Sequence, residues 1–196
     1  VYRQGKEVKG VTWSVYKNYK KVTQNFGTFY QSSDTGSTVT DSFGVAYENL
    51  ARHLGLEAEH PNDLAGKLMS LQSFGEHDIE YSNELDPEGW LKHKGPILSD
   101  LTKLDMAKTF HNKLSDQILD IIEKYVDIGE NILITGGCAQ NISWNTVFKQ
   151  YFRNLLVTPH SADDGLSLGA IKWLADKNKV KLERSQFPYW QQDEAP

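Results

Sequence analysis

The amino-acid sequence predicts an α/β fold in which a mainly parallel sheet carries helices on its faces. Asp105–Val126 shows an amphipathic helical pattern and runs almost directly into the apolar segment Ile132–Thr135. Two glycines follow, then a helical pattern, a second apolar segment at Leu155–Thr158, and another helix. This order of helix, strand, glycine turn, helix, strand and helix is typical of parallel strands connected by helices that pack on the sheet.

Composition and charge favour an ordinary globular protein. The chain has 196 residues, of which 39% are hydrophobic and 24% charged, so we expect a single domain over residues 1–196. The net charge of −5 disfavours binding to nucleic acid or to an anionic membrane surface. No apolar run approaches the roughly 20 residues that cross a bilayer, so we expect no membrane partner.

The single cysteine and the first residues indicate the cellular context. Cys138 excludes an intrachain disulfide, which fits a reducing cytoplasm. Its thiol could act as a nucleophile, but a buried packing role beside a glycine turn is commoner, and no histidine lies near it in sequence. Residues 1–10 contain neither a signal-peptide core nor a start methionine, which predicts a cytoplasmic chain cut from a longer protein.

The first part of the chain predicts strands. Val11–Tyr16 and Tyr19–Thr23 are rich in aromatic and β-branched residues, and Lys17-Asn18 between them predicts a hairpin turn. A further strand is expected near Ile79–Tyr81, in a region that proline and glycine otherwise interrupt.

An amphipathic helix is predicted between these strands. Its apolar residues recur at helical spacing, with a cap at Thr40 or Asp41 and an end at Gly55. Gly44 inside it costs about 1 kcal/mol relative to alanine, so either a packed backbone or a ligand is expected to approach there.

A second helix is predicted over Asn62–Leu71, and Lys67 in its middle is either a solvated lysine or a functional one. Histidines 77, 93 and 111 do not show the spacing of a metal site, so we expect them at the surface.

The segments that follow the two C-terminal strands are the candidate site. In open α/β sheets ligands bind beyond the carboxyl ends of strands, and Gly136 and Gly137 would let a phosphate or an adenine ring approach the main chain. The pair lacks the glycine pattern of a dinucleotide site and the Lys-Ser/Thr of a P-loop. Asp163 and Asp164 precede a helix that begins at Gly165, and either can cap it or face the glycine turn and hold a metal.

Four stretches resemble one family. ITGGCAQN (residues 134–141) and TPHSADDGLSLGA (158–170) resemble the nucleotide-binding half of O-carbamoyltransferases of the nodulation and antibiotic-tailoring type. That family is similar to the carbamoyltransferase of hydrogenase maturation and to the tRNA threonylcarbamoyladenosine synthases. DSFGVAYENLARHLG (41–55) resembles a helix of the tRNA-modifying relatives, and AGKLMSLQSFG (65–75) resembles a segment of the carbamoyltransferases.

The resemblance implies a ribonuclease-H-like, actin-like ATPase lobe of the sugar-kinase superfamily, with a mixed sheet and helices on both faces. It implies that ATP and carbamoyl phosphate form carbamoyl adenylate, whose carbamoyl group passes to a hydroxyl of a small-molecule acceptor. The chain would be the second, nucleotide-binding lobe, and its partners would be the first lobe and the C-terminal domain of the same protein.

Carried over to matching positions, the resemblance implies nucleotide contacts at Gly136, Gly137 and Asn141. It also implies that Asp41 and Gly44 approach the ribose or the adenine.

The resemblance implies that Asp163 is a ligand of a divalent metal, iron or magnesium, and that Asp164 is a helix cap or a supporting partner. Lys67 is a possible contact to substrate or nucleotide. The paired metal histidines of the family, spaced H-x-x-x-H, are absent from the sequence, so we expect these residues alone to have little or no transfer activity.

Two other functional classes stay open. A sugar-kinase or acetate-kinase lobe of the same fold would phosphorylate its substrate, and a non-catalytic module would keep only nucleotide binding.

Overall fold

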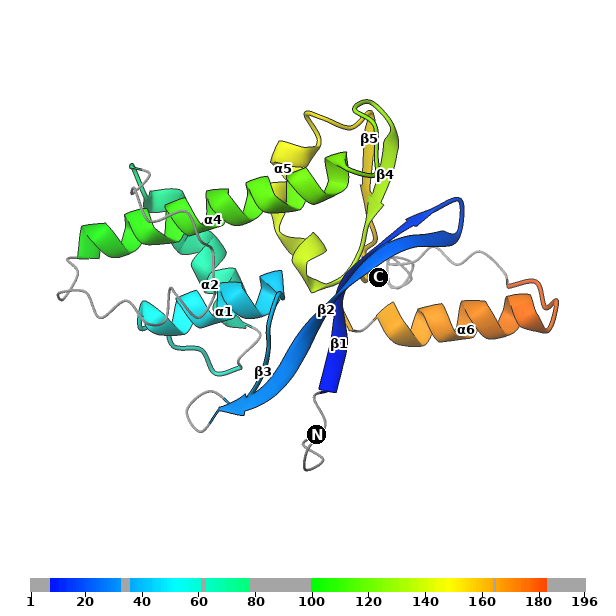
Figure 1. The fold of residues 1–196 in the computed structure, drawn as a ribbon, viewed down its shortest axis with the longest axis horizontal. Coiled ribbons are helices and arrows are strands. Elements are labelled where there is room, and N and C mark those ends of the chain that lie inside the picture. Colours follow the sequence, from blue (N-terminus) through cyan, green and yellow to red (C-terminus); the bar gives the residue numbers. More distant parts are fainter. Residues whose placement is uncertain (1–7, 33–35, 61–62, 78–99, 164, 183–196) are drawn as a thin grey trace, which may run out of the picture. The chain divides into compact units, whose positions relative to one another are not determined.

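The computed structural model of the protein describes residues 8–32, 36–60, 63–77, 100–163 and 165–182. The chain divides into two compact units, Val1–Asp127 and Ile128–Pro196. Both units combine helices with strands, which confirms the predicted α/β class (Figure 1). None of the helices within the described ranges is long and apolar enough to cross a membrane.

The first unit begins with a three-stranded antiparallel sheet in the order β1-β2-β3. β1 (Val8–Lys17) and β2 (Lys20–Ser32) form the predicted hairpin, and both strands extend beyond the predicted bounds. The turn residues are Asn18 and Tyr19, with φ of 52° and 63°, one position later than predicted. Two successive left-handed residues form the turn that matches the twist of a tight hairpin.

β3 (Gly36–Val39) was not predicted, because its four residues carry no apolar alternation. Its pairing with β2 is antiparallel, as is the pairing of β1 with β2. The expectation of a mainly parallel sheet is therefore wrong for the described strands of the first unit. The strand expected near Ile79–Tyr81 lies outside the described residues.

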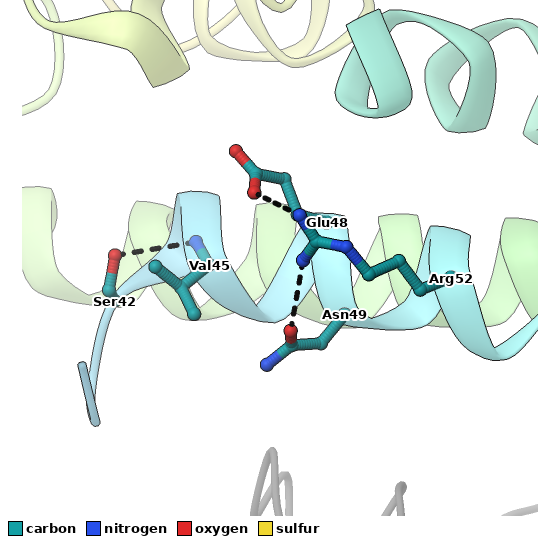
Figure 2. A network of polar contacts seen from close by, with 5 residues as sticks. All are labelled: Ser42, Val45, Glu48, Asn49 and Arg52. Atoms are coloured by element: carbon teal, nitrogen blue, oxygen red, sulfur yellow. Dashed lines mark hydrogen bonds and ion pairs between the residues drawn. The ribbon is translucent and has the colours of Figure 1, made fainter. Parts of the chain in front are cut away.

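Among the described residues of this unit, three α-helices follow: α1 (Phe43–His53), α2 (Asp63–Leu71), which continues into the short 3₁₀ turn η1 (Gln72–Phe74), and α4 (Asp100–Glu123). All three α-helices were predicted, although α4 begins five residues before the expected Asp105. The cap of α1 is Ser42 rather than Thr40 or Asp41: Ser42 Oγ accepts a hydrogen bond from Val45 N at 3.4 Å. Arg52 lies on the same helix and donates to Glu48 and Asn49, as Figure 2 shows.

The core of the first unit lies between α1, α2 and α4 and consists of the apolar residues Ala46, Leu50, Ala51, Leu54, Leu64, Leu68, Met106, Ala107, Phe110 and Leu114. Tyr47 belongs to this core, and its ring stacks on Phe110 with the centroids 6.4 Å apart. The hydroxyl of Tyr47 is 2.7 Å from Nδ1 of His111, which is only 4% exposed. The surface position expected for His111 is therefore wrong, whereas His77 is exposed and His93 lies outside the described residues.

A second buried polar contact fixes the chain that follows η1. The carboxylate of Asp105 accepts hydrogen bonds from the backbone amides of Glu76 (2.9 Å) and His77 (3.0 Å). These amides hold the pKa of Asp105 below its ordinary value. Gly75 packs against α4 so closely that a Cβ there would lie 2.7 Å from the carbonyl oxygen of Leu104.

The second unit contains the parallel pair β4 (Asn131–Ile134) and β5 (Asn154–Val157), both close to their predicted positions. Between them lie the 3₁₀ turn η2 (Gly137–Gln140) and α5 (Ile142–Phe148), and α6 (Gly165–Lys177) follows β5. The single helix expected over Ala139–Phe152 is thus shorter and is preceded by a separate turn. The chain is extended at Asn141, with φ −74° and ψ 98°, which separates the two segments.

Candidate functional site

The two candidate segments of the second unit lie side by side at the carboxyl ends of β4 and β5. The two strands are paired along their whole length: Asn131 lies opposite Asn154 at one end, and Ile134 lies opposite Val157 at the other. One residue farther on, the hydroxyls of Thr135 and Thr158 are 3.4 Å apart. Gly136 N then donates a 2.7 Å hydrogen bond to the carbonyl of Ser161. The glycine turn and the loop that carries Asp163 are therefore joined directly.

The glycine turn leaves its main chain open. Gly136 has a φ of +100°, a conformation that side-chain-bearing residues rarely adopt. A Cβ at Gly137 would meet no other atom within 4 Å, and both glycines are exposed. The amide of Gly136 is engaged by Ser161, so an anion bound here would have to use other donors.

Asn141 lies inside this segment rather than at its surface. It is 7% exposed, and its Oδ1 accepts a hydrogen bond from Trp144 N at 3.1 Å, which caps α5. The neighbouring Asn145 donates from Nδ2 to the carbonyl of Ala139 at 2.7 Å. These two asparagines hold η2 against α5 and so shape the glycine turn. The capping role was not predicted, although an asparagine at the start of a helical pattern is a recognised signal for it.

Asp163 is exposed at the end of the second loop. Its backbone carbonyl accepts from Leu166 N at 3.1 Å, and Gly165 N donates to the carbonyl of Ala162 at 3.0 Å. Gly165 itself is required by packing, because a Cβ there would lie 2.1 Å from the carbonyl oxygen of His160. Asp164, expected to cap the helix or support Asp163, lies outside the described residues.

The described residues do not fit a divalent metal on their own. Such an ion takes several oxygen or nitrogen ligands. Across the described ranges, no group of three or more histidine, cysteine, aspartate or glutamate side chains comes together. Asp163 is a single carboxylate, so other residues would have to supply the remaining ligands.

Cys138 is exposed, so the expectation that its thiol is buried is wrong. Its neighbour Ala139 is the buried residue of η2, at 1% exposure. A short 3₁₀ turn buries only one side, and Cys138 lies outside that side.

Asp41, in the first unit, occupies the turn between β3 and α1. Its side chain is exposed and its φ is +54°, in the left-handed region. The hydroxyl of Thr40 donates to Asp41 Oδ2 at 3.3 Å. Gly44 lies in the first turn of α1 and is half-buried.

Lys67 has a structural partner. It is exposed on α2, and its Nζ donates to the carbonyl of Glu57 in the segment after α1. This contact connects α2 to the end of α1 and explains the lysine without a ligand.

The comparisons with known proteins agree with the resemblance noted in the sequence. Residues 88–171 match the family model described as the carbamoyltransferase N-terminus. The chain is 31% identical over 182 residues to an uncharacterized protein of Methanocaldococcus jannaschii, covering 78% of this chain and 34% of that protein. It is 25% identical over 187 residues to Nodulation protein U of Azorhizobium caulinodans, covering 72% of this chain and 33% of that protein.

The chain thus spans about a third of the length of the curated relatives that it matches. The family match contains both the glycine turn and the loop of Asp163. These findings confirm the resemblance to nodulation-type carbamoyltransferases.

Proposed function

We propose that this chain is part of a carbamoyltransferase and that its second unit contributes to the nucleotide site. The observation that carries the proposal is the hydrogen bond between Gly136 N and Ser161 O. It joins two segments that resemble the family separately, at the strand edge where α/β proteins bind ligands. Both segments lie within the matched residues 88–171.

In the proposed reaction, water cleaves carbamoyl phosphate to carbamate and inorganic phosphate. A carbamate oxygen then bonds to the α-phosphorus of ATP as pyrophosphate leaves, which gives carbamoyl adenylate. A hydroxyl oxygen of a small-molecule acceptor then bonds to the carbamoyl carbon, and AMP leaves. The chain's own contribution is to hold the nucleotide: Gly136 and Gly137 present open main chain to it, while Asn141 keeps the turn in shape.

The remaining residues have narrower proposed roles. Asp163 is a candidate for one ligand of a metal whose other ligands come from outside the described residues; such an ion would stabilise charge on phosphate oxygens. Asp41 and Gly44 are proposed to approach the ribose or the adenine of a nucleotide. Lys67 is a proposed contact to substrate or nucleotide, and to reach it the ammonium would have to leave the backbone carbonyl of Glu57.

The test is a substitution at Gly137 in the natural polypeptide that carries these residues. Gly137→Ala adds a methyl group where the protein itself has open space, so the fold should accept it. If a nucleotide lies against this backbone, the affinity for ATP in calorimetry should fall at least tenfold, which is about 1.4 kcal/mol. Gly66→Ala is the matched control, because Gly66 is also exposed with no atom within 4 Å of its added Cβ.

A second pair of variants tests Asp163. Asp163→Asn should reduce the formation of carbamoylated product in an assay with ATP, carbamoyl phosphate and a hydroxyl acceptor. Asp176→Asn is the control, since Asp176 is also an exposed acid of the same unit, paired with Lys172 on α6.

Two results would contradict the proposal. ATP consumption with a sugar while carbamoyl phosphate stays inert would indicate a kinase instead. An absence of ATP and ADP binding, together with wild-type behaviour of Asp163→Ala, would indicate a non-catalytic module.

A further inference from the structure

The turn between β3 and α1 holds Asp41 in an unusual backbone conformation. Its φ of +54° lies in the left-handed region, which a few per cent of non-glycine residues adopt. Three residues make contacts next to this turn: Gly27 and Thr28 of β2, and Thr40, which precedes Asp41.

At Thr40, where the pairing of β3 with β2 ends, a side-chain hydroxyl takes the place of a backbone carbonyl as hydrogen-bond acceptor. Its backbone amide donates to the carbonyl of Thr28 at 3.1 Å, as in a regular antiparallel pair. In return, the amide of Thr28 donates to the hydroxyl of Thr40, at 2.9 Å, instead of to a backbone carbonyl. The same hydroxyl donates a hydrogen bond to Oδ2 of Asp41 at 3.3 Å. One side chain therefore links the sheet to the Asp41 carboxylate.

Gly27 determines where the backbone of Thr40 lies. Gly27 is buried, and a Cβ at this position would be 1.9 Å from the carbonyl oxygen of Thr40 and 2.9 Å from its carbonyl carbon. Because these are backbone atoms, a side chain at residue 27 could be accommodated only by moving the turn.

We propose that Gly27 and Thr40 are positioning residues that hold the Asp41 carboxylate for the ribose hydroxyls of the bound nucleotide. This inference rests on the proposed function, in which Asp41 contacts the nucleotide. A carboxylate accepts hydrogen bonds only, so vicinal hydroxyls of a ribose are suitable donors to it. The bond from Thr40 occupies Oδ2 and restricts the rotation of the carboxylate, so less order has to be imposed when the ligand binds.

The first experiment compares Gly27→Ala with Gly10→Ala in the natural polypeptide that carries these residues. Gly10 is the direct partner of Gly27 across the hairpin, so each variant replaces one strand glycine by alanine. The three atoms nearest to an added Cβ at Gly10 all belong to the ring of Phe29, an exposed side chain that can rotate away. Calorimetry with ADP should show at least a tenfold loss of affinity for Gly27→Ala and less than a twofold change for Gly10→Ala.

The second experiment changes Thr40 and does not depend on whether Gly27→Ala folds. Thr40→Ser keeps the hydroxyl and should bind ADP as the wild type does. Thr40→Val keeps the branched shape but loses both hydrogen bonds of the hydroxyl, and its ADP affinity should fall about five- to tenfold. A residue with only a structural role would give no difference in affinity between two well-folded variants.

A ligand lacking the hydroxyls separates positioning from general damage. With 2′,3′-dideoxyadenosine diphosphate, wild type, Asp41→Asn and Thr40→Val should bind with equal affinity, because the groups that Asp41 would accept are absent. With ADP, the two variants should bind more weakly than wild type.

Each outcome decides between the proposals. If the wild type binds ADP but Gly27→Ala and Gly10→Ala bind equally well, and Thr40→Val binds like Thr40→Ser, only the positioning inference is overturned. If Asp41→Asn binds ADP like the wild type, the ribose contact and the positioning inference both fail, while the glycine turn is unaffected. If the wild type binds no nucleotide, the proposed function fails and the inference fails with it.

Discussion

Lowering the pH should destabilise the first unit through His111. The side chain is buried between α1 and α4, and its Nδ1 lies 2.7 Å from the hydroxyl of Tyr47. Burial disfavours the charged imidazolium and lowers the pKa of His111 from 6.5 to about 4. The folded protein therefore keeps His111 neutral at a pH where the unfolded chain has already bound a proton.

The sign and size follow from this difference. Between pH 6.5 and 4 the unfolded state binds more protons, so the free energy of unfolding falls as the pH falls through this window. At pH 5 the loss relative to pH 7.5 is about 2 kcal/mol, and it approaches about 3 kcal/mol below pH 4. Stability from this group is complete above pH 6.5.

The assay is urea denaturation followed at several pH values between 7.5 and 4.5. Carboxylates also titrate near the lower end, so the effect of His111 is the difference between the wild type and His111→Phe. This variant keeps an aromatic ring beside Tyr47 but cannot titrate. It should be less stable at pH 7.5, because the Tyr47 hydroxyl loses its partner, and its stability should fall less as the pH is lowered. Equal slopes for the two proteins would refute the reasoning.

Two further predictions concern the second unit and the chain as a whole. Asn141→Ala should lower the free energy of unfolding by about 1 kcal/mol through loss of the α5 cap, and Asn141→Asp should keep most of the stability. Chemical denaturation measures both variants. Equal stability of Asn141→Ala and wild type would contradict the capping role. The 196 residues alone should show little or no carbamoyl transfer with ATP, carbamoyl phosphate and a hydroxyl acceptor, because the sequence has no H-x-x-x-H pair. Robust product from this chain would contradict that expectation.

Several elements could be predicted because their signals are local. The apolar stripe of α4, the apolar runs of β4 and β5 and the spacing in α1 are all periodic within one segment of chain. The sequence allows the glycine turn and the Asp163 loop to lie side by side, because the carboxyl ends of parallel strands meet at one edge of a sheet. The hydrogen bond from Gly136 N to Ser161 O shows that the two segments are in contact.

Other features depend on contacts between residues that are distant in sequence. The residues of β3 are too polar to predict a strand, and they form one because they pair with β2. His111 lies on a helical face that becomes buried only when α1 packs against α4. The hydroxyl of Tyr47 is then its hydrogen-bond partner. Cys138 is exposed because η2 replaces the expected first turn of a longer helix.

The sequence by itself determined the α/β class, the positions of most helices and strands, and the family that the two C-terminal segments resemble. Periodicity, glycines and short motifs carry that information within a few residues. Only the tertiary structure decided that Gly136 is hydrogen-bonded to Ser161, that Asn141 caps a helix, and that Gly27 packs against the backbone of Thr40, whose hydroxyl donates to Asp41. These depend on how closely two backbones approach, and no local pattern of residues specifies such a distance.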